Sequence, residues 1–258
     1  MRIFVLLAAL FVFTFTRVAS ACNDIPTDLK SLLNPGHLLL FGESHGTKQY
    51  PKKISDVVCY LSENGRVVNI GLELPSDISD ELNRFITNKD ISEKTVLKHP
   101  IWHQKFQDGR TSQAMLRLIQ DMKVLNQRKN NISLFSFDEW NFKPSERDKS
   151  MARNVYDNFN YQAVNIVLVG NLHSSRSNHA NAQSSLIDFL SDRLKITSVL
   201  FRSQGGYSWY CRPECGRWPS KGKPKKIVVE FYQDSEINHH DWVWNIGPTE
   251  SSAPAVVN

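Results

Sequence analysis

Several patterns that mark common enzyme classes are missing from this sequence. It has no glycine-rich phosphate loop and no Gly-x-Ser-x-Gly motif, and the second absence weighs against the nucleophile elbow of an α/β-hydrolase. It has no internal repeat and, after the first residues, no second long apolar run. A chain of 258 residues with 41% apolar residues therefore fits one large globular domain with a substantial core.

Cysteine is scarce, with residues 22, 59, 211 and 215 only. In an exported chain, four cysteines suggest disulfide bonds. Cys211 and Cys215 are close enough in sequence to close a small hairpin loop, and Cys22 with Cys59 is the remaining pair. A zinc site is the weaker alternative, because the Cys-Arg-Pro-Glu-Cys spacing matches no familiar zinc knuckle.

Residues 1–21 differ in character from the rest of the chain. Arg2 precedes an apolar stretch over 3–15, and Ala19-Ser20-Ala21 supplies the small residues of a cleavage site. This pattern predicts a signal peptide cleaved near Ala21, and a secreted or periplasmic protein that begins at Cys22. The stretch is short for a membrane span. Acylation of Cys22 as a lipoprotein is the less favoured alternative, because Ala19 is a poor match to the large aliphatic residue usual there.

The formal net charge is +5, and much of it is local. Basic residues cluster over 212–226, without the regularly interleaved aromatic residues that would indicate nucleic-acid binding. Such a segment is usually a solvated surface, and peripheral contact with an anionic membrane is the alternative. We expect no nucleic-acid partner.

Apolar runs and amphipathic segments alternate along the chain, which predicts an α/β fold. We expect a mainly parallel sheet with helices on both faces and antiparallel additions near the C-terminus. The predicted domain covers 22–247, with insertions at 88–110 and 205–226 and a disordered tail over 248–258. The main predicted strands are 37–43, 66–72, 132–137 and 164–169, and the clearest predicted helices are 50–64 and 112–129.

Titratable residues follow each of these four strands. Glu43 and His45 end the first strand, and Glu73, Asp138 and His173 follow the next three. Parallel strands point their carboxyl ends to one edge of the sheet, where ligands bind in open α/β sheets. The set therefore predicts a functional site, whereas each residue alone is more simply explained by packing or helix capping. Because no cysteine lies at this edge, we expect no thiolate mechanism.

The motifs at these positions resemble a known superfamily. They are Gly-Glu-Ser-His-Gly at 42–46, Leu-Glu-Leu-Pro at 72–75, Glu-Arg-Asp-x-x-Met-Ala-x-Asn-Val at 146–155 and Val-Gly-Asn-Leu-His-x-x-Arg at 169–176. Their order and spacing are similar to those of the superfamily that unites erythromycin esterases, ChaN-like haem-uptake lipoproteins and Tiki-type proteases. The resemblance implies the fold of that superfamily, an α/β sheet with helical additions. It also implies that Glu43, His45, Glu73 and His173 are functional positions. Arg176 stands where the esterases carry a second histidine.

The leading hypothesis is hydrolysis of an ester or amide bond in a small-molecule or peptide substrate. His45 would be the general base, supported by Glu43 or Glu73. The oxyanion would be stabilised by His173 or Arg176. The predicted substrate-binding residues are Arg147, Arg153, Arg176 and Trp102, although Arg147 and Arg153 could instead hold Glu73 in place.

Two alternatives use the same edge differently. In the first, His45, Glu73, Asp138 and His173 bind manganese or zinc and leave a coordination position for water. In the second, suggested by the ChaN-like branch, the protein binds haem or iron through its histidines and has no catalytic activity. The sequence alone does not decide between these hypotheses.

Overall fold

A computed structural model describes residues 22–139, 143–176, 184–222, 226–235 and 239–257. The predicted signal peptide lies outside the described residues, so its prediction stays untested. Within the described ranges, no helix combines the length and the apolar character needed to cross a bilayer.

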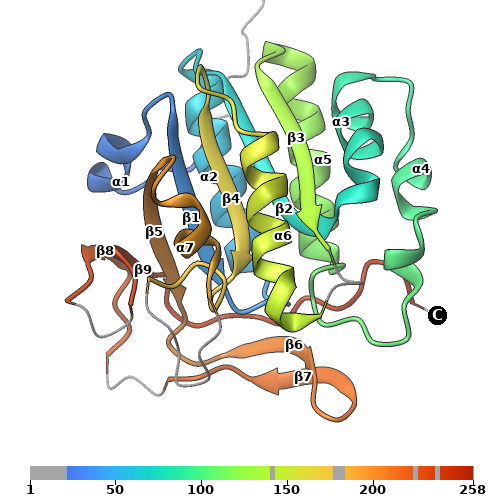
Figure 1. Ribbon diagram of the computed structural model, residues 1–258. Helices are drawn as coiled ribbons and strands as arrows, with labels where there is room; N and C mark the ends of the chain where they lie inside the picture. Colours follow the sequence, from blue (N-terminus) through green and yellow to red (C-terminus); the bar gives the residue numbers. More distant parts are fainter. Residues whose placement is uncertain (1–21, 140–142, 177–183, 223–225, 236–238, 258) are drawn as a thin grey trace, which may run out of the picture.

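A seven-stranded sheet forms the centre of the molecule, in the order β3-β2-β4-β1-β5-β9-β8 (Figure 1). All neighbouring strands in it are parallel except β8, which pairs antiparallel with β9 at the edge. A separate antiparallel hairpin joins β6 and β7. This confirms the predicted fold class. The strands are β1 (His37–Glu43), β2 (Val68–Pro75), β3 (Ile132–Asp138), β4 (Val164–Gly170), β5 (Lys195–Arg202), β6 (Tyr207–Cys211), β7 (Cys215–Pro219), β8 (Glu230–Gln233) and β9 (Trp242–Asn245).

Helices cover both faces of the sheet (Figure 1). Alternate residues of β1 serve the two sides: Leu39 and Phe41 join one apolar cluster, and Leu38 and Leu40 join the other. A strand buried on both faces requires this continuous apolar run. The first cluster includes α2 (Gln49–Glu63), α3 (Ser79–Thr87) and α5 (Gln113–Lys129), and the second includes α6 (Pro144–Asp157) and α7 (Leu186–Leu190). The remaining helical elements are α1 (Thr27–Leu32), η1 (Ser76–Ile78), α4 (Glu93–Leu97) and η2 (Pro100–His103).

The segment 248–257 is ordered by backbone hydrogen bonds, which corrects the predicted disordered tail. It makes isolated bridges to Thr47, Ser112 and Gly206. Ser252, within it, is 3% exposed. Composition misled the prediction, because small polar residues say nothing about backbone hydrogen bonds made to distant loops.

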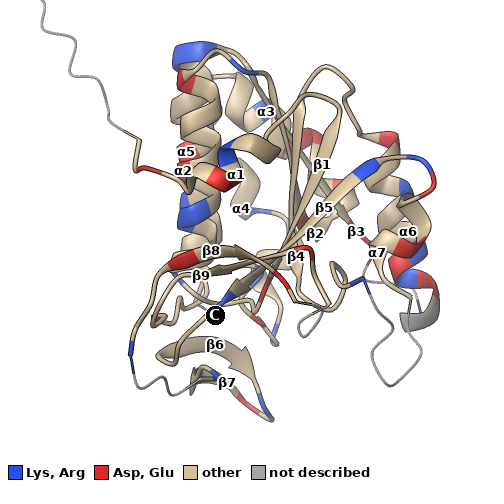
Figure 2. Cartoon of the chain, turned by 90° about the vertical axis from the view of Figure 1, so that its left-hand side faces the viewer, with Lys and Arg blue, Asp and Glu red and all other residues tan. Residues whose placement is uncertain are grey.

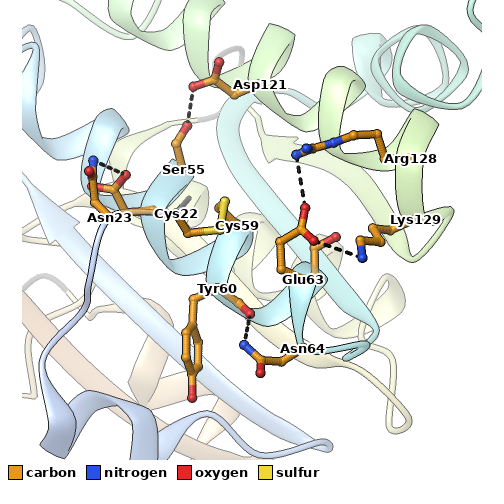
Figure 3. The surroundings of a disulfide bond; sticks show 12 residues. Cys22, Asn23, Ser55, Cys59, Tyr60, Glu63, Asn64, Asp121, Arg128 and Lys129 are labelled. Carbon is orange, nitrogen blue, oxygen red and sulfur yellow. Dashed lines mark hydrogen bonds and ion pairs between the residues drawn. A yellow bond between two sulfur atoms is a disulfide. The ribbon is translucent and has the colours of Figure 1, made fainter. Parts of the chain in front are cut away.

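Both predicted disulfide bonds are present, Cys22–Cys59 and Cys211–Cys215. The first ties the chain ahead of α1 to α2, beside Ser55 and Asp121, which are joined by a hydrogen bond (Figure 3). Disulfide bonds form and persist in oxidising compartments. The two bonds are therefore consistent with an extracellular or periplasmic protein.

Loss of the longer disulfide should destabilise the protein. The Cys22–Cys59 bond spans 37 residues and Cys211–Cys215 spans 4. Chain entropy then predicts losses in the free energy of unfolding of about 4 kcal/mol for Cys59→Ser and about 2 kcal/mol for Cys211→Ser. Urea unfolding of both variants, beside the reduced and oxidised wild type, measures this. Equal losses in the two variants would contradict the chain-entropy explanation.

Candidate functional site

Glu43, His45, Glu73, Asp138 and His173 meet at the carboxyl ends of four adjacent strands, β3, β2, β4 and β1. Gly170, the last residue of β4, lies among them. A Cβ atom placed on Gly170 would be 3.2 Å from Nε2 of His45, 3.4 Å from Cδ2 of His173 and 3.5 Å from Oε2 of Glu73. A side chain at this position would crowd His45 and fill the space next to His173 and Glu73, which glycine leaves open.

His45 lies between two buried carboxylates. Its Nδ1 is 3.0 Å from Oε1 of Glu43, and its Nε2 is 3.4 Å from Oε2 of Glu73. Burial disfavours the charged ring, but the charge of Glu73 and the hydrogen bond to Glu43 outweigh it and raise the pKa of His45 to about 10. A ring with both nitrogens protonated has no lone pair to accept a proton. The two carboxylates therefore favour the cationic form of His45.

Glu73 is the central anion of the cluster. It is 3% exposed, and its Oε2 accepts a 2.6 Å hydrogen bond from the backbone N–H of Gly170. Its Oε1 accepts a hydrogen bond of 2.8 Å from Nη2 of Arg147. Burial raises the pKa of Glu73, but the opposing charges of His45 and Arg110 lower it well below its usual range. Glu73 is therefore a carboxylate throughout the neutral pH range.

Two arginines hold the third buried carboxylate, Asp138. Arg147 donates from Nε and Nη2 to its two oxygens at 2.8 and 2.9 Å. Arg110 donates from Nη1 to Oδ2 at 2.7 Å, and the same nitrogen lies 3.7 Å from Glu73. Arg147 therefore supports Glu73, the second of the two roles predicted for it. Arg110, from the 88–110 insertion, was not among the predicted site residues.

His173 pairs with a residue that sequence reasoning also missed, Asp148. Nδ1 of His173 lies 2.5 Å from Oδ1 of Asp148, so this nitrogen carries the proton that the carboxylate accepts. The other nitrogen, Nε2, faces Nη1 of Arg147 at 3.4 Å and Oε1 of Glu73 at 3.9 Å. Facing a guanidinium donor, Nε2 of His173 is the acceptor. Asp148 lies within the Arg-Asp-x-x-Met-Ala motif on which the resemblance is based. This motif is the sequence signal that could have identified Asp148 as a site residue.

Three predicted substrate-binding residues lie elsewhere. Trp102 is fully buried in the core, where its ring packs against apolar side chains. Arg153 points outward from α6, with a side chain 81% exposed and paired with Asp157. Arg176 pairs with Asp241. Helical periodicity explains the position of Arg153, because residues 147 and 153 of α6 face different directions.

Charge and exposure divide the site into a buried acidic floor and a more exposed basic layer. The side chains of Glu43, Glu73 and Asp138 are 1–3% exposed, whereas those of His45, His173, Arg110 and Arg147 are 19–23% exposed. Solvent therefore meets nitrogen-bearing groups first. The hairpin β6–β7 lies beyond this edge of the sheet in both views (Figures 1 and 2).

The donor set does not fit the predicted zinc or manganese site. Among the residues that the structure describes, no group of three or more His, Cys, Asp or Glu side chains is arranged to hold a metal ion. Arg147 and Arg110 bind the oxygens of Glu73 and Asp138, and so occupy the ligand positions with fixed positive charge. The surroundings do not fit haem either, because a porphyrin needs an apolar crevice and both Nε2 atoms face charged groups.

Stability should fall at alkaline pH because of His45. Its pKa rises from 6.5 to about 10 on folding, so its contribution is complete below about pH 6.5 and is lost as the pH rises through about 10. Glu73, whose folded pKa is lowered, contributes above its unfolded value of about 4.3 and loses this as the pH falls through its folded value. Urea midpoints from pH 2 to 11 measure both. His45→Gln should flatten the alkaline decline, and an unchanged decline would contradict the assignment.

Comparison with known proteins identifies the fold. No protein-family model matches the chain, and no curated protein matches its sequence. Three solved structures share its architecture. A protein from Bacillus cereus matches with a TM-score of 0.65 and 11% identity, over 89% of this chain and 93% of its own. A succinoglycan biosynthesis protein gives 0.64 and 12%, over 88% and 91%. A mutant of erythromycin esterase EreC in its open conformation gives 0.56 and 10%, over 89% and 95%. At these identities the likeness concerns the fold alone, and it confirms the fold implied by the motifs: that of erythromycin esterase.

Proposed function

We propose that the protein is an exported hydrolase that cleaves an ester or amide bond in a small-molecule or peptide substrate. One observation carries the proposal: two histidines with different carboxylate partners flank Gly170, at 3.2 and 3.4 Å from the position of a Cβ atom there. Histidines in different surroundings can take the acid and the base role of one reaction. The shared fold with an erythromycin esterase supports the hydrolase class, and the two disulfide bonds support export.

His173 is the general base in this proposal. Asp148 holds its Nδ1–H, which leaves Nε2 to accept a proton from water. The water oxygen then forms a bond to the carbonyl carbon of the substrate. Nε2 also lies 3.4 Å from Nη1 of Arg147. In this proposal, His173 has the general-base role that the sequence analysis assigned to His45.

His45 is the electrophilic partner. It is an imidazolium between Glu43 and Glu73, and its Nε2 faces the same Cβ position of Gly170 as the ring of His173. Its positive charge stabilises the oxyanion that forms when water adds to the carbonyl group. When the carbon–oxygen or carbon–nitrogen bond breaks, the leaving group takes a proton from His45 and the product acid is released. Proton transfer from His173 to His45 through solvent then restores the resting enzyme.

A substrate screen tests this proposal. The chain from Cys22, purified with its disulfide bonds formed, is assayed against generic esters, lactones and peptides, with and without a chelator. We expect turnover of at least one class that survives chelation and is lost in both His45→Gln and His173→Gln. Turnover that persists in both variants, or that vanishes on chelation, counts against this mechanism. A haem titration of the same protein should show no Soret change.

A further inference from the structure

The segment 248–257 runs along the site edge of the sheet, where it follows the carboxyl ends of the strands (Figure 1, dark red). Its backbone is joined to three other parts of the chain that surround the site. Lys48 N–H donates to Glu250 O at 2.8 Å, and Tyr207 N–H donates to Thr249 O at 2.7 Å. Gln113 N–H donates to Ala253 O at 2.8 Å. The segment therefore links the loop after β1, the hairpin and the start of α5.

The carbonyl group of Gly46, directly after His45, is the main point of attachment. It accepts hydrogen bonds from Trp209 N–H and from Ser252 N–H, both at 2.8 Å. Gly46 also touches the loop that carries Arg110, since a Cβ atom on Gly109 would lie 2.3 Å from Gly46 N. The backbone directly after His45 is thus confined by close contacts.

The side chain of Ser252 makes a second contact, with the start of α5. Its Oγ accepts a 2.9 Å hydrogen bond from Ala114 N–H, one of the first N–H groups of α5. Ala255 N–H donates to Thr111 O at 2.9 Å, one residue after Arg110. The first N–H groups of a helix have no partner within it, so residues distant in sequence can cap it. Ser252 therefore joins the His45 loop to the start of α5.

We propose that Ser252 is a positioning residue: its N–H holds the carbonyl group of Gly46 and so fixes the loop of His45, with the imidazole placed beside Glu73. This inference rests on the proposed function, because it gives Ser252 a part in the same site. The position of His45 sets its electrostatic surroundings. The charged or titratable groups around that ring are Glu43, Glu73, Asp108, Arg110 and His173.

The test follows the ring titration of His45 by NMR. This measurement needs no substrate, so its result can be interpreted even if the proposed function is wrong. Ser252→Pro removes the N–H that binds Gly46. We expect the pKa of His45 to fall by at least one unit toward 6.5, and kcat, where a substrate is known, to fall about tenfold with a smaller change in KM. Ser252→Ala keeps that N–H and loses only the cap on Ala114. It should lower the melting temperature and leave the His45 titration as in the wild type.

The control is Glu250→Gln, a change in the same segment 248–257 that breaks the exposed ion pair between Glu250 and Lys48. It should change neither the pKa of His45 nor the melting temperature. A wild-type titration of His45 in folded Ser252→Pro would overturn the proposal, as would equal shifts in both Ser252 variants. If Ser252→Pro does not fold, hydrogen exchange in the wild type decides. The amide of Ser252 should then be protected as strongly as that of Trp209, and rapid exchange at Ser252 alone would refute the proposal.

Discussion

Replacing Arg147 by methionine should lower the free energy of unfolding by about 3–5 kcal/mol, the range for a buried ion pair that loses one partner. Arg147 donates to Glu73 and bidentately to Asp138, and these carboxylates are 3% and 1% exposed. Methionine fills similar space without a charge, so both anions lose a donor in a place that water barely reaches. Because the Arg147 side chain is itself 23% exposed, we expect the lower end of this range.

The same helix offers a matched control. Arg153→Met makes the same chemical change on the outer face of α6, where the side chain is 81% exposed and pairs with Asp157 one turn later. Exposed pairs of this kind contribute about 0.3–0.5 kcal/mol. Urea unfolding of the two variants at pH 7 compares them directly. Similar small losses would mean that solvent already screens Glu73 and Asp138, and the acidic floor would then be less buried than the structure has it.

The architecture could be predicted from sequence because its signals are local. Leu38 to Phe41 is a continuous apolar run that ends at glycine, and a strand buried on both faces needs such a run. The convergence of Glu43, Glu73, Asp138 and His173 follows from topology alone. Parallel strands end at one edge, and the four strands that carry these groups are neighbours in the sheet.

The errors concern properties that only tertiary structure sets. Arg110 lies in an irregular insertion, and nothing local indicates that its guanidinium reaches Asp138. The strand β9 has only four residues, too few for a periodic signal, and it is defined by pairing with β5 and β8. Trp102 was assigned to a binding loop because its surroundings in sequence are polar, whereas its side chain lies in the core. Protonation states also escape sequence reasoning, since that of His45 depends on two carboxylates arriving from different strands.

His173→Gln should lower kcat about 10²–10⁴-fold, the usual contribution of a positioned general base. Glutamine keeps a polar side chain but cannot take a proton from water. Asp148→Asn should cost about 10²-fold or more, because the amide can no longer fix the imidazole with its proton on Nδ1. His103→Gln is the control, since His103 lies in η2 and binds Leu97 O, and it should leave kcat unchanged. Full activity in His173→Gln would remove this histidine from the mechanism.

The pH dependence of kcat/KM separates the two histidines. With a pKa of about 10, His45 acting as a cation predicts activity that falls as the pH rises through about 10, whereas His45 acting as a base predicts activity that rises toward that value. Glu43→Gln sharpens the comparison. It removes the carboxylate charge next to Nδ1, which helps to raise the pKa of His45, so the alkaline limb should move to lower pH. The opposite result is activity that rises up to pH 10, with a pH profile that Glu43→Gln does not shift. It would make His45 the general base and His173 the group that stabilises the oxyanion.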